Sequence, residues 1–202
     1  MRIDNDPKLD FDDVLIRPKR SEAPSRASIV LDRPYRFLNS GAAWRGVPIV
    51  ASNMDTVGTI AMADALGPPM LTCLHKYYSE EQLIRFFRDE TRCASAFFTL
   101  GLKEEEFDKL RAVKSKTGVR LVCVDAANGY TKYFVEHVQR IRQAFPELTI
   151  MAGNVATPDM VQELLISGAA DIVKIGIGPG SVCTTRRTTG VGYPQLSAII
   201  EC

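Results

Sequence analysis

The sequence predicts an α/β protein built as a parallel (β/α)8 barrel, the TIM barrel, with about six βα units present. Short apolar runs alternate with helix-like segments six times along the 202 residues. Polar or glycine-rich residues follow most of these runs, and only a barrel would bring all of them to one mouth. The other candidate, an open doubly wound sheet, would normally carry a dinucleotide fingerprint. That fingerprint is incomplete here, because Ser181 stands where its third glycine would fall.

Each expected strand is short, apolar and rich in β-branched residues, as strands buried on both faces of a parallel sheet are. The loops that follow them contain Asn, Asp, His or Gly, which suits the end of a barrel where sites form. The expected strands are 47–51, 70–74, 96–100, 121–124, 149–152 and 171–177.

The segments between the strands have helical patterns, and two of them carry clear start signals. Ser79 with Gln82 forms a capping box, and Thr157 precedes a proline at the first helical position. The expected helices are 60–66, 80–89, 104–114, 132–145, 159–166 and 195 to the end.

We expect residues 1–202 to form a single domain, the N-terminal part of a barrel, preceded by an arm over residues 1–40. The arm is polar, is interrupted by Pro18, Pro24 and Pro34, and has a basic cluster at 17–20 that is typical of a solvated surface. A complete barrel has eight units in about 250 residues. With six units, the chain is expected to be truncated at its C-terminus.

Composition excludes several classes of function. The 25 Lys and Arg balance 24 Asp and Glu, so the net charge of +1 favours neither nucleic acid nor an anionic membrane as a partner. No apolar run reaches the roughly 18 residues of a membrane span, and the N-terminus lacks the apolar core of a signal peptide, which together predict a cytoplasmic protein. The five cysteines are odd in number and form no C-x-x-C pair, so we expect reduced thiols and no structural metal cluster.

The segment 174–194 is the strongest candidate for a site, because an apolar strand runs into a glycine-rich loop that presents Cys183. The neighbouring Arg186 and Arg187 would lower the pKa of this thiol and favour a nucleophilic thiolate. Cys73, Cys93 and Cys123 lie in or beside apolar segments and are expected to be buried and unreactive. Asp125, at a strand end, fits either a turn cap or a ligand-holding carboxylate. His75 receives no catalytic role.

From residue 8 to residue 202 the chain resembles the GMP reductases of the IMP dehydrogenase / GMP reductase family. The absence of inserted modules after the second strand, together with the motifs around 53–58, 128–130 and 192–195, favours a reductase over a dehydrogenase. The resemblance is carried by LDFDDVLIRPKRS, SNMDTVGT, HKYYS, VDAANGY, MAGNVAT and KIGIGPGSVCTTRRTTGVGYPQLSAIIEC.

This resemblance implies an oxidoreductase of purine salvage that converts GMP to IMP and ammonia with NADPH. It implies that Cys183 attacks C2 of the purine to give a thioimidate, and that Thr185 relays protons. Two alternatives stay open. One is an IMP dehydrogenase that oxidises IMP with NAD, and the other is an inactive barrel fragment that only associates with full-length subunits.

The resemblance also implies binding residues, a homotetramer, and a potassium ion held by loop carbonyls. The resemblance places the adenosine contacts in the arm and across a subunit boundary, where arginine suits a 2′-phosphate. The implied substrate residues are Ser181, Met54 and Asn154; the cofactor residues are Ser25, Arg26, Lys76, Asp125, Ala126, Ala127, Ile177 and Gly178; and the potassium ligands are Gly178, Gly180, Cys183 and Arg186.

Overall fold

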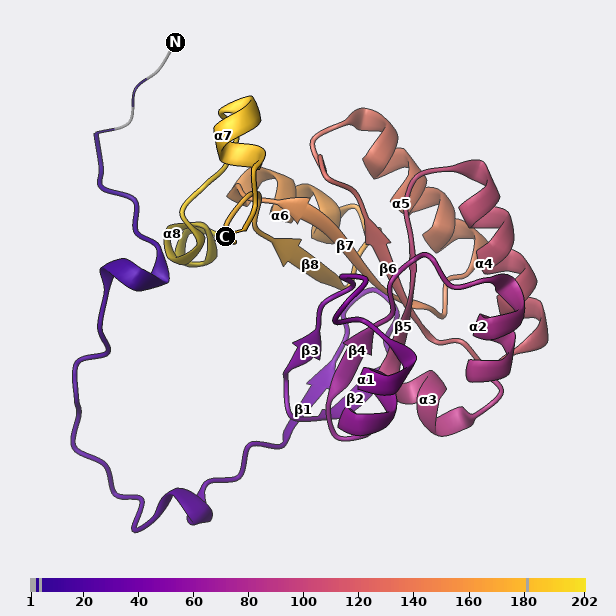
Figure 1. Ribbon diagram of the computed structural model, residues 1–202, viewed down its shortest axis with the longest axis horizontal. Coiled ribbons are helices and arrows are strands. Elements are labelled where there is room, and N and C mark those ends of the chain that lie inside the picture. The colour runs from indigo at the N-terminus through magenta and orange to yellow at the C-terminus, as the bar shows by residue number, and fades with distance from the viewer. Residues whose placement is uncertain (1–2, 4, 181) are drawn as a thin grey trace.

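The computed structural model describes residues 3, 5–180 and 182–202. Its main sheet has six parallel strands that pair in sequence order and curl into part of a barrel (Figure 1). The predicted fold class is therefore confirmed. The strands are β3 (Val50–Ala51), β4 (Leu71–Cys73), β5 (Ala96–Leu100), β6 (Leu121–Asp125), β7 (Thr149–Val155) and β8 (Ile172–Ile175).

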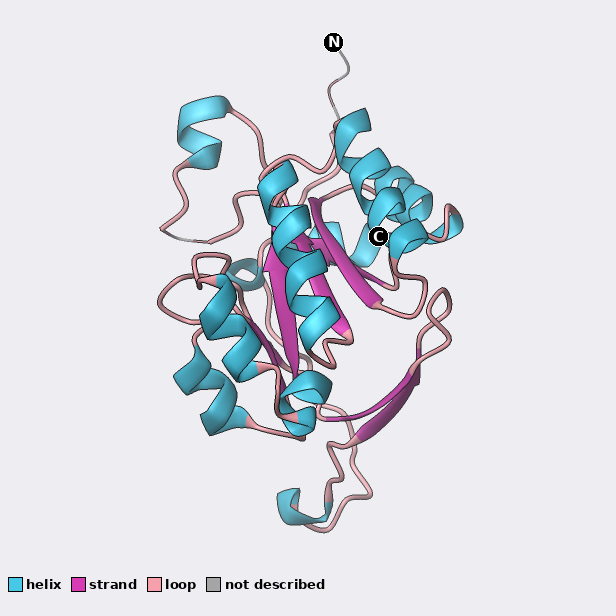
Figure 2. Cartoon of the chain, turned by 90° about the vertical axis from the view of Figure 1, so that its right-hand side faces the viewer, coloured by secondary structure: helices cyan, strands magenta, loops and turns pink. Residues whose placement is uncertain are grey.

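Helices cover the outer side of the curled sheet, as Figure 2 shows. All six predicted helices are present, and two short ones were not predicted, α3 and α7. The Asp89 carboxylate accepts hydrogen bonds from the N–H groups of Thr91 and Arg92, so a new helix begins inside the expected loop. The helices are α1 (Ile60–Leu66), α2 (Glu80–Phe86), α3 (Glu90–Ser95), α4 (Glu104–Lys116), α5 (Lys132–Ala144), α6 (Pro158–Ile166), α7 (Thr185–Thr189) and α8 (Gln195–Glu201).

The core has two parts, one on each face of the sheet. The larger part lies between the sheet and the helices and includes Phe98, Leu110 and Ile141, all almost fully buried. The smaller part fills the inside of the curl. Alternate residues of one strand serve the two parts, as Phe97 and Phe98 do on β5. The inner part consists of Leu71, Cys73, Phe97, Leu121, Cys123 and Met151, with Trp44 and Ile172 against it.

An antiparallel hairpin precedes the barrel strands and was not predicted. It pairs β1 (Arg33–Arg36) with β2 (Ala43–Gly46) and lies apart from the main sheet in Figure 2. Trp44 of β2 packs against the inner core. The hairpin spans residue 40, the boundary expected between arm and barrel, and that boundary stays a prediction. Before the hairpin, the arm contains two short 3-10 turns, η1 (Phe11–Asp13) and η2 (Arg26–Ser28).

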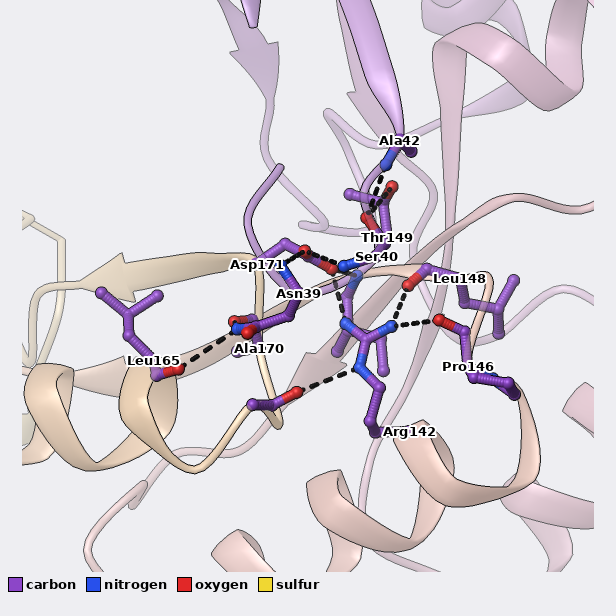
Figure 3. A network of polar contacts seen from close by, with 12 residues as sticks. Asn39, Ser40, Ala42, Arg142, Pro146, Leu148, Thr149, Leu165, Ala170 and Asp171 are labelled. Atoms are coloured by element: carbon purple, nitrogen blue, oxygen red, sulfur yellow. Dashed lines mark hydrogen bonds and ion pairs between the residues drawn. The ribbon is translucent and has the colours of Figure 1, made fainter. Parts of the chain in front are cut away.

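A buried polar network joins the hairpin to the N-terminal ends of β7 and β8 (Figure 3). The Asp171 carboxylate accepts from the N–H groups of Asn39 and Ser40 at 3.0 and 2.8 Å and from Ile150 N–H at 3.0 Å. It also pairs with Arg142 at 2.6 Å. The loop of the hairpin is thereby fixed at the bottom of the barrel, opposite the C-terminal strand ends where a site is expected.

Among the described residues, no helix is both long enough and apolar enough to cross a membrane.

Candidate active site

The loop after β8 presents Cys183 beside the first turn of α7. The chain turns at Gly180, whose carbonyl accepts from the Cys183 N–H at 3.0 Å. Figure 1 shows α7 standing beyond the C-terminal end of β8. Gly176 and Gly178 have positive φ angles of 138° and 65°, which permit this path because glycine carries no Cβ. The predicted nucleophile therefore lies at the mouth of the barrel.

Cys183 is half-buried and contacts the predicted proton relay directly. Its thiol donates to the Thr185 hydroxyl, with Sγ and Oγ1 3.2 Å apart. Hydrogen bonding with the Thr185 side chain, then with its backbone, and the charge of Arg186 together lower the pKa of the Cys183 thiol. This thiol is therefore more easily ionised than an ordinary cysteine.

Arg186 holds the loop in place by contacts with both the N-terminal arm and the segment that precedes α8. Its guanidinium pairs with Asp10 of the arm at 3.0 Å and donates to the Tyr193 carbonyl at 2.6 Å. The Asp10 carboxylate also accepts from the Gln195 N–H at the start of α8. These contacts, led by Arg186, lower the pKa of Asp10. A Cβ on Gly192 would lie 2.5 Å from the Arg186 side chain, so any larger residue would displace that side chain.

Two cavities flank the Cys183 loop. Cys183 lines one of about 590 Å³, and Thr185 lines another of about 580 Å³. The two residues of the hydrogen-bonded pair thus belong to different cavities. The first is lined by Asp10, Phe11, Asp12, Gly178, Pro179, Gly180, Cys183, Arg186, Arg187 and Gln195, and the second by Ala127, Asn128, Tyr130, Ile177, Thr185, Thr189 and Val191.

The loop after β6 is held beside β7 by backbone hydrogen bonds. Ala126 N–H donates to the Gly153 carbonyl at 2.8 Å, and Asn154 N–H donates to the Ala126 carbonyl at 2.9 Å. The Asn154 carbonyl in turn accepts from Gly129 at 3.0 Å. A predicted substrate residue and two predicted cofactor residues, Ala126 and Ala127, are therefore close together at the mouth.

Other predicted residues are spread more widely. Met54 follows β3 and is exposed, with its carbonyl accepting from the N–H groups of Val57 and Gly58. Lys76 follows the C-terminal end of β4, and its carbonyl accepts from the Lys109 ammonium at 3.3 Å. Ser25 and Arg26 lie at η2 in the arm, which runs away from the mouth in Figure 1, so one chain does not bring them to the Cys183 loop. Ser181 lies outside the described residues.

Two of the carbonyls predicted to bind potassium already accept backbone hydrogen bonds. Gly180 O accepts from Cys183 N–H, and Arg186 O accepts from Gly190 N–H at 3.1 Å. A carbonyl has two lone pairs, so these bonds leave capacity for an ion. In the described part of the chain, no group of three or more His, Cys, Asp or Glu is arranged to hold a metal.

Sequence reasoning gave no role to two residues that the structure places at the site. Asp10 holds Arg186, and Lys174 on β8 donates to Asp125 and to Asn53, each at 2.7 Å. A lysine inside an apolar strand was a visible signal for Lys174. Asp10 had no local signal, because its partner is 176 residues away.

Comparison with known proteins identifies similar chains. Residues 8–202 match the family model described as the IMP dehydrogenase / GMP reductase domain. The chain is 53% identical over 206 residues to a GMP reductase of Aeromonas salmonicida (strain A449), covering all of this chain and 59% of the relative. It is 53% identical over 205 residues to a GMP reductase of Caenorhabditis elegans, covering 57% of that protein.

Among solved structures, an inosine 5′ monophosphate dehydrogenase from Legionella pneumophila superimposes with a TM-score of 0.81 at 33% identity. The match covers 97% of this chain and 59% of that one. The chain therefore spans less than two thirds of the length of the proteins it matches.

Proposed function

This chain belongs to the IMP dehydrogenase / GMP reductase family, and from that premise we propose that it carries the nucleophile of a GMP reductase. The proposed reaction converts GMP to IMP and ammonia with NADPH. The observation that carries the proposal is the contact between the Cys183 thiol and the Thr185 hydroxyl at the barrel mouth. Relatives named GMP reductase, at 53% identity, favour this activity over IMP dehydrogenase, for which the matched structure is 33% identical.

In the first step Cys183 Sγ attacks C2 of the purine. The Sγ–C2 bond forms and the bond from C2 to its exocyclic nitrogen breaks, which leaves a thioimidate. The thiol proton passes through the Thr185 hydroxyl to the departing nitrogen, which leaves as ammonia. The 3.2 Å contact supports this route, because the thiol already donates to that hydroxyl.

In the second step C2 of the thioimidate is reduced and the thiolate of Cys183 is released, giving IMP. NADPH supplies the hydride for this step. The cavity beside Thr185 fits such a group, because Ala127 and Ile177 line it and Asp125 ends the neighbouring strand. A lowered pKa makes the Cys183 thiolate a good leaving group as well as a good nucleophile.

The remaining assignments are part of the same proposal. Met54, Asn154 and Ser181 would contact the nucleotide; Lys76, Ala126 and Gly178 would complete the cofactor site; and the carbonyls of Gly178, Gly180, Cys183 and Arg186 would hold a potassium ion. Ser25 and Arg26 would hold the adenosine end of NADPH across a subunit boundary in a homotetramer. Their place in the arm, away from the mouth of their own chain, supports this last assignment. The proposed location is the cytoplasm.

The experiment measures NADPH oxidation and ammonia release by the purified chain with GMP, with Cys183→Ala as the matched control. We expect both signals with GMP and neither in the control. Oxidation of IMP with NAD, without the reductase reaction, would instead support the dehydrogenase.

A second candidate, association with longer subunits without catalysis, is favoured by the sheet edges. In the described sheet β3 and β8 each pair with one strand only, and Val50 and all of β8 are partly exposed. A folded chain that lacks turnover alone, yet assembles with a full-length relative, would support this candidate.

A further inference from the structure

One row of residues crosses three neighbouring strands just below the barrel mouth. In the parallel register Asp125 of β6 is the partner of Gly153 of β7, and Gly153 is the partner of Lys174 of β8. Residues in one row of a sheet point to the same face. The acidic and the basic side chain are therefore on the same side of the sheet with a glycine between them.

Gly153 leaves the space that lets Lys174 reach Asp125. A Cβ at Gly153 would lie 2.6 Å from the Lys174 Cβ and 2.6 Å from the Lys174 carbonyl oxygen. Such contacts are shorter than real side chains tolerate, so any larger residue would displace the lysine or the strand. With glycine in the row, Lys174 Nζ comes within 2.7 Å of Asp125 Oδ1.

The same ammonium also reaches the far side of the curl. Lys174 Nζ donates to Asn53 Oδ1 at 2.7 Å, and Asn53 follows β3, the first strand of the sheet. One side chain thus ties the ends of β3, β6 and β8 together. The described contacts involve Oδ1 of Asp125, which leaves Oδ2 to accept from a hydroxyl or amide of a ligand.

The ion pair between Lys174 and Asp125 is partly buried, and Lys174 keeps its charge there. The side chains of Lys174 and Asp125 are 23% and 24% exposed. Burial alone would lower the pKa of Lys174, but the charge and the hydrogen bond of the Asp125 carboxylate oppose it, and the net effect raises that pKa. Lys174 therefore remains an ammonium, and a charge-assisted hydrogen bond of this kind is shorter and stronger than a neutral one.

We propose that Lys174 is a positioning residue that acts through Asp125, orienting its carboxylate toward the nicotinamide half of the cofactor, with Asn53 as the second anchor. The inference rests on the proposed function, because the contact between Asp125 and the cofactor is part of that proposal. It predicts that removal of the ammonium weakens cofactor binding without unfolding the barrel.

The experiment titrates NADPH into the 202-residue chain and measures the dissociation constant for wild type, Lys174→Met, Asp125→Asn and the double variant. We expect Lys174→Met to weaken binding about tenfold, the value of one charge-assisted hydrogen bond. The double variant should bind no more weakly than Asp125→Asn, because Lys174 acts through that carboxylate. Lys174→Arg keeps the charge and should recover most of the affinity.

Lys132→Met is the matched control, because its ion pair with Glu136 is on the exposed face of α5. Urea unfolding of each variant separates an effect on positioning from an effect on folding. If Lys174→Met does not fold, the dissociation constants of Lys174→Arg and Asn53→Ala for NADPH test the inference instead. The inference would be overturned, with the proposed function left intact, if wild type and Lys174→Met bound NADPH with equal affinity. It would also be overturned if the loss of affinity in the double variant were the product of the two single losses. If the wild type binds no NADPH, the proposed cofactor site fails and the inference falls with it.

Discussion

Among the described cysteines, only Cys183 combines partial exposure with a lowered pKa, because Cys123 is buried and the pKa of Cys202 is raised. Cys73, Cys93 and Cys123 are at most 2% exposed. Burial raises the pKa of Cys93, and burial, rather than any partner, is also the main reason why the pKa of Cys202 is raised. The pKa of Cys183 is lowered, chiefly by Thr185. Reactivity is therefore concentrated on the residue that the proposed mechanism uses.

Replacement of Thr185 by Val should slow the alkylation of Cys183. The variant loses the hydroxyl that favours the thiolate, so the pKa of Cys183 rises and a smaller fraction of the thiol is ionised at neutral pH. We expect a severalfold lower rate with iodoacetamide at pH 7.5, measured by peptide mass spectrometry. Cys202→Ser is the control and should leave the rate at Cys183 unchanged. An unaltered rate in Thr185→Val would show that the hydroxyl does not govern the thiol.

The roles of Cys183 and Thr185 could be proposed from sequence because both stand in one short loop. Lys174 and Asp10 could not, because their partners are 49 and 176 residues away and meet them only after the sheet has curled. The same holds for Asn53, whose side chain accepts from Lys174, 121 residues away. Long-range polar contacts of this kind leave no periodic pattern in a sequence.

At the scale of elements, the strands and most helices followed from apolar runs and capping residues. The hairpin of β1 and β2 did not, because the four residues of β1, Arg-Pro-Tyr-Arg, are all exposed and carry no alternating pattern. Its position depends on Trp44 and on the network around Asp171, which are tertiary contacts. The helix α7 was missed for a related reason, since its Thr-Arg-Arg-Thr-Thr sequence has no apolar face and no buried residue.

Arg142→Met should strongly destabilise the barrel. The Asp171 side chain is fully buried and that of Arg142 is 13% exposed, so the variant leaves a buried carboxylate without its cation. Breaking a buried pair in this way costs about 3–5 kcal/mol in the free energy of unfolding. Urea unfolding measures the loss.

Lys132→Met serves as the control again, because it breaks an exposed pair and should leave the unfolding curve nearly unchanged. A loss in Arg142→Met no larger than in this control would show that the network does not hold the hairpin to the barrel.

In the molecule as a whole, the contacts that stabilise the fold and the residues of the proposed site lie at opposite ends of the curled sheet. The buried ion pair and the hairpin are at the N-terminal strand ends, while Cys183, Asp125 and Asn154 are at the C-terminal ends. The arm connects the two regions, because Asp10 returns to Arg186 and Leu9 exchanges hydrogen bonds with Ser197 of α8. Substitutions at the bottom should therefore alter stability, and substitutions at the mouth should alter ligand binding.

The proposed reaction requires Cys183 to be the nucleophile toward GMP. The most direct test incubates the chain with GMP, quenches with acid, and locates any covalent adduct by peptide mass spectrometry, with Cys183→Ser treated in parallel. We predict an adduct on the Cys183 peptide that adds the mass of GMP minus ammonia, and none in the variant. NADPH oxidation that depends on GMP but yields no adduct at Cys183, or an adduct on another cysteine, would contradict it.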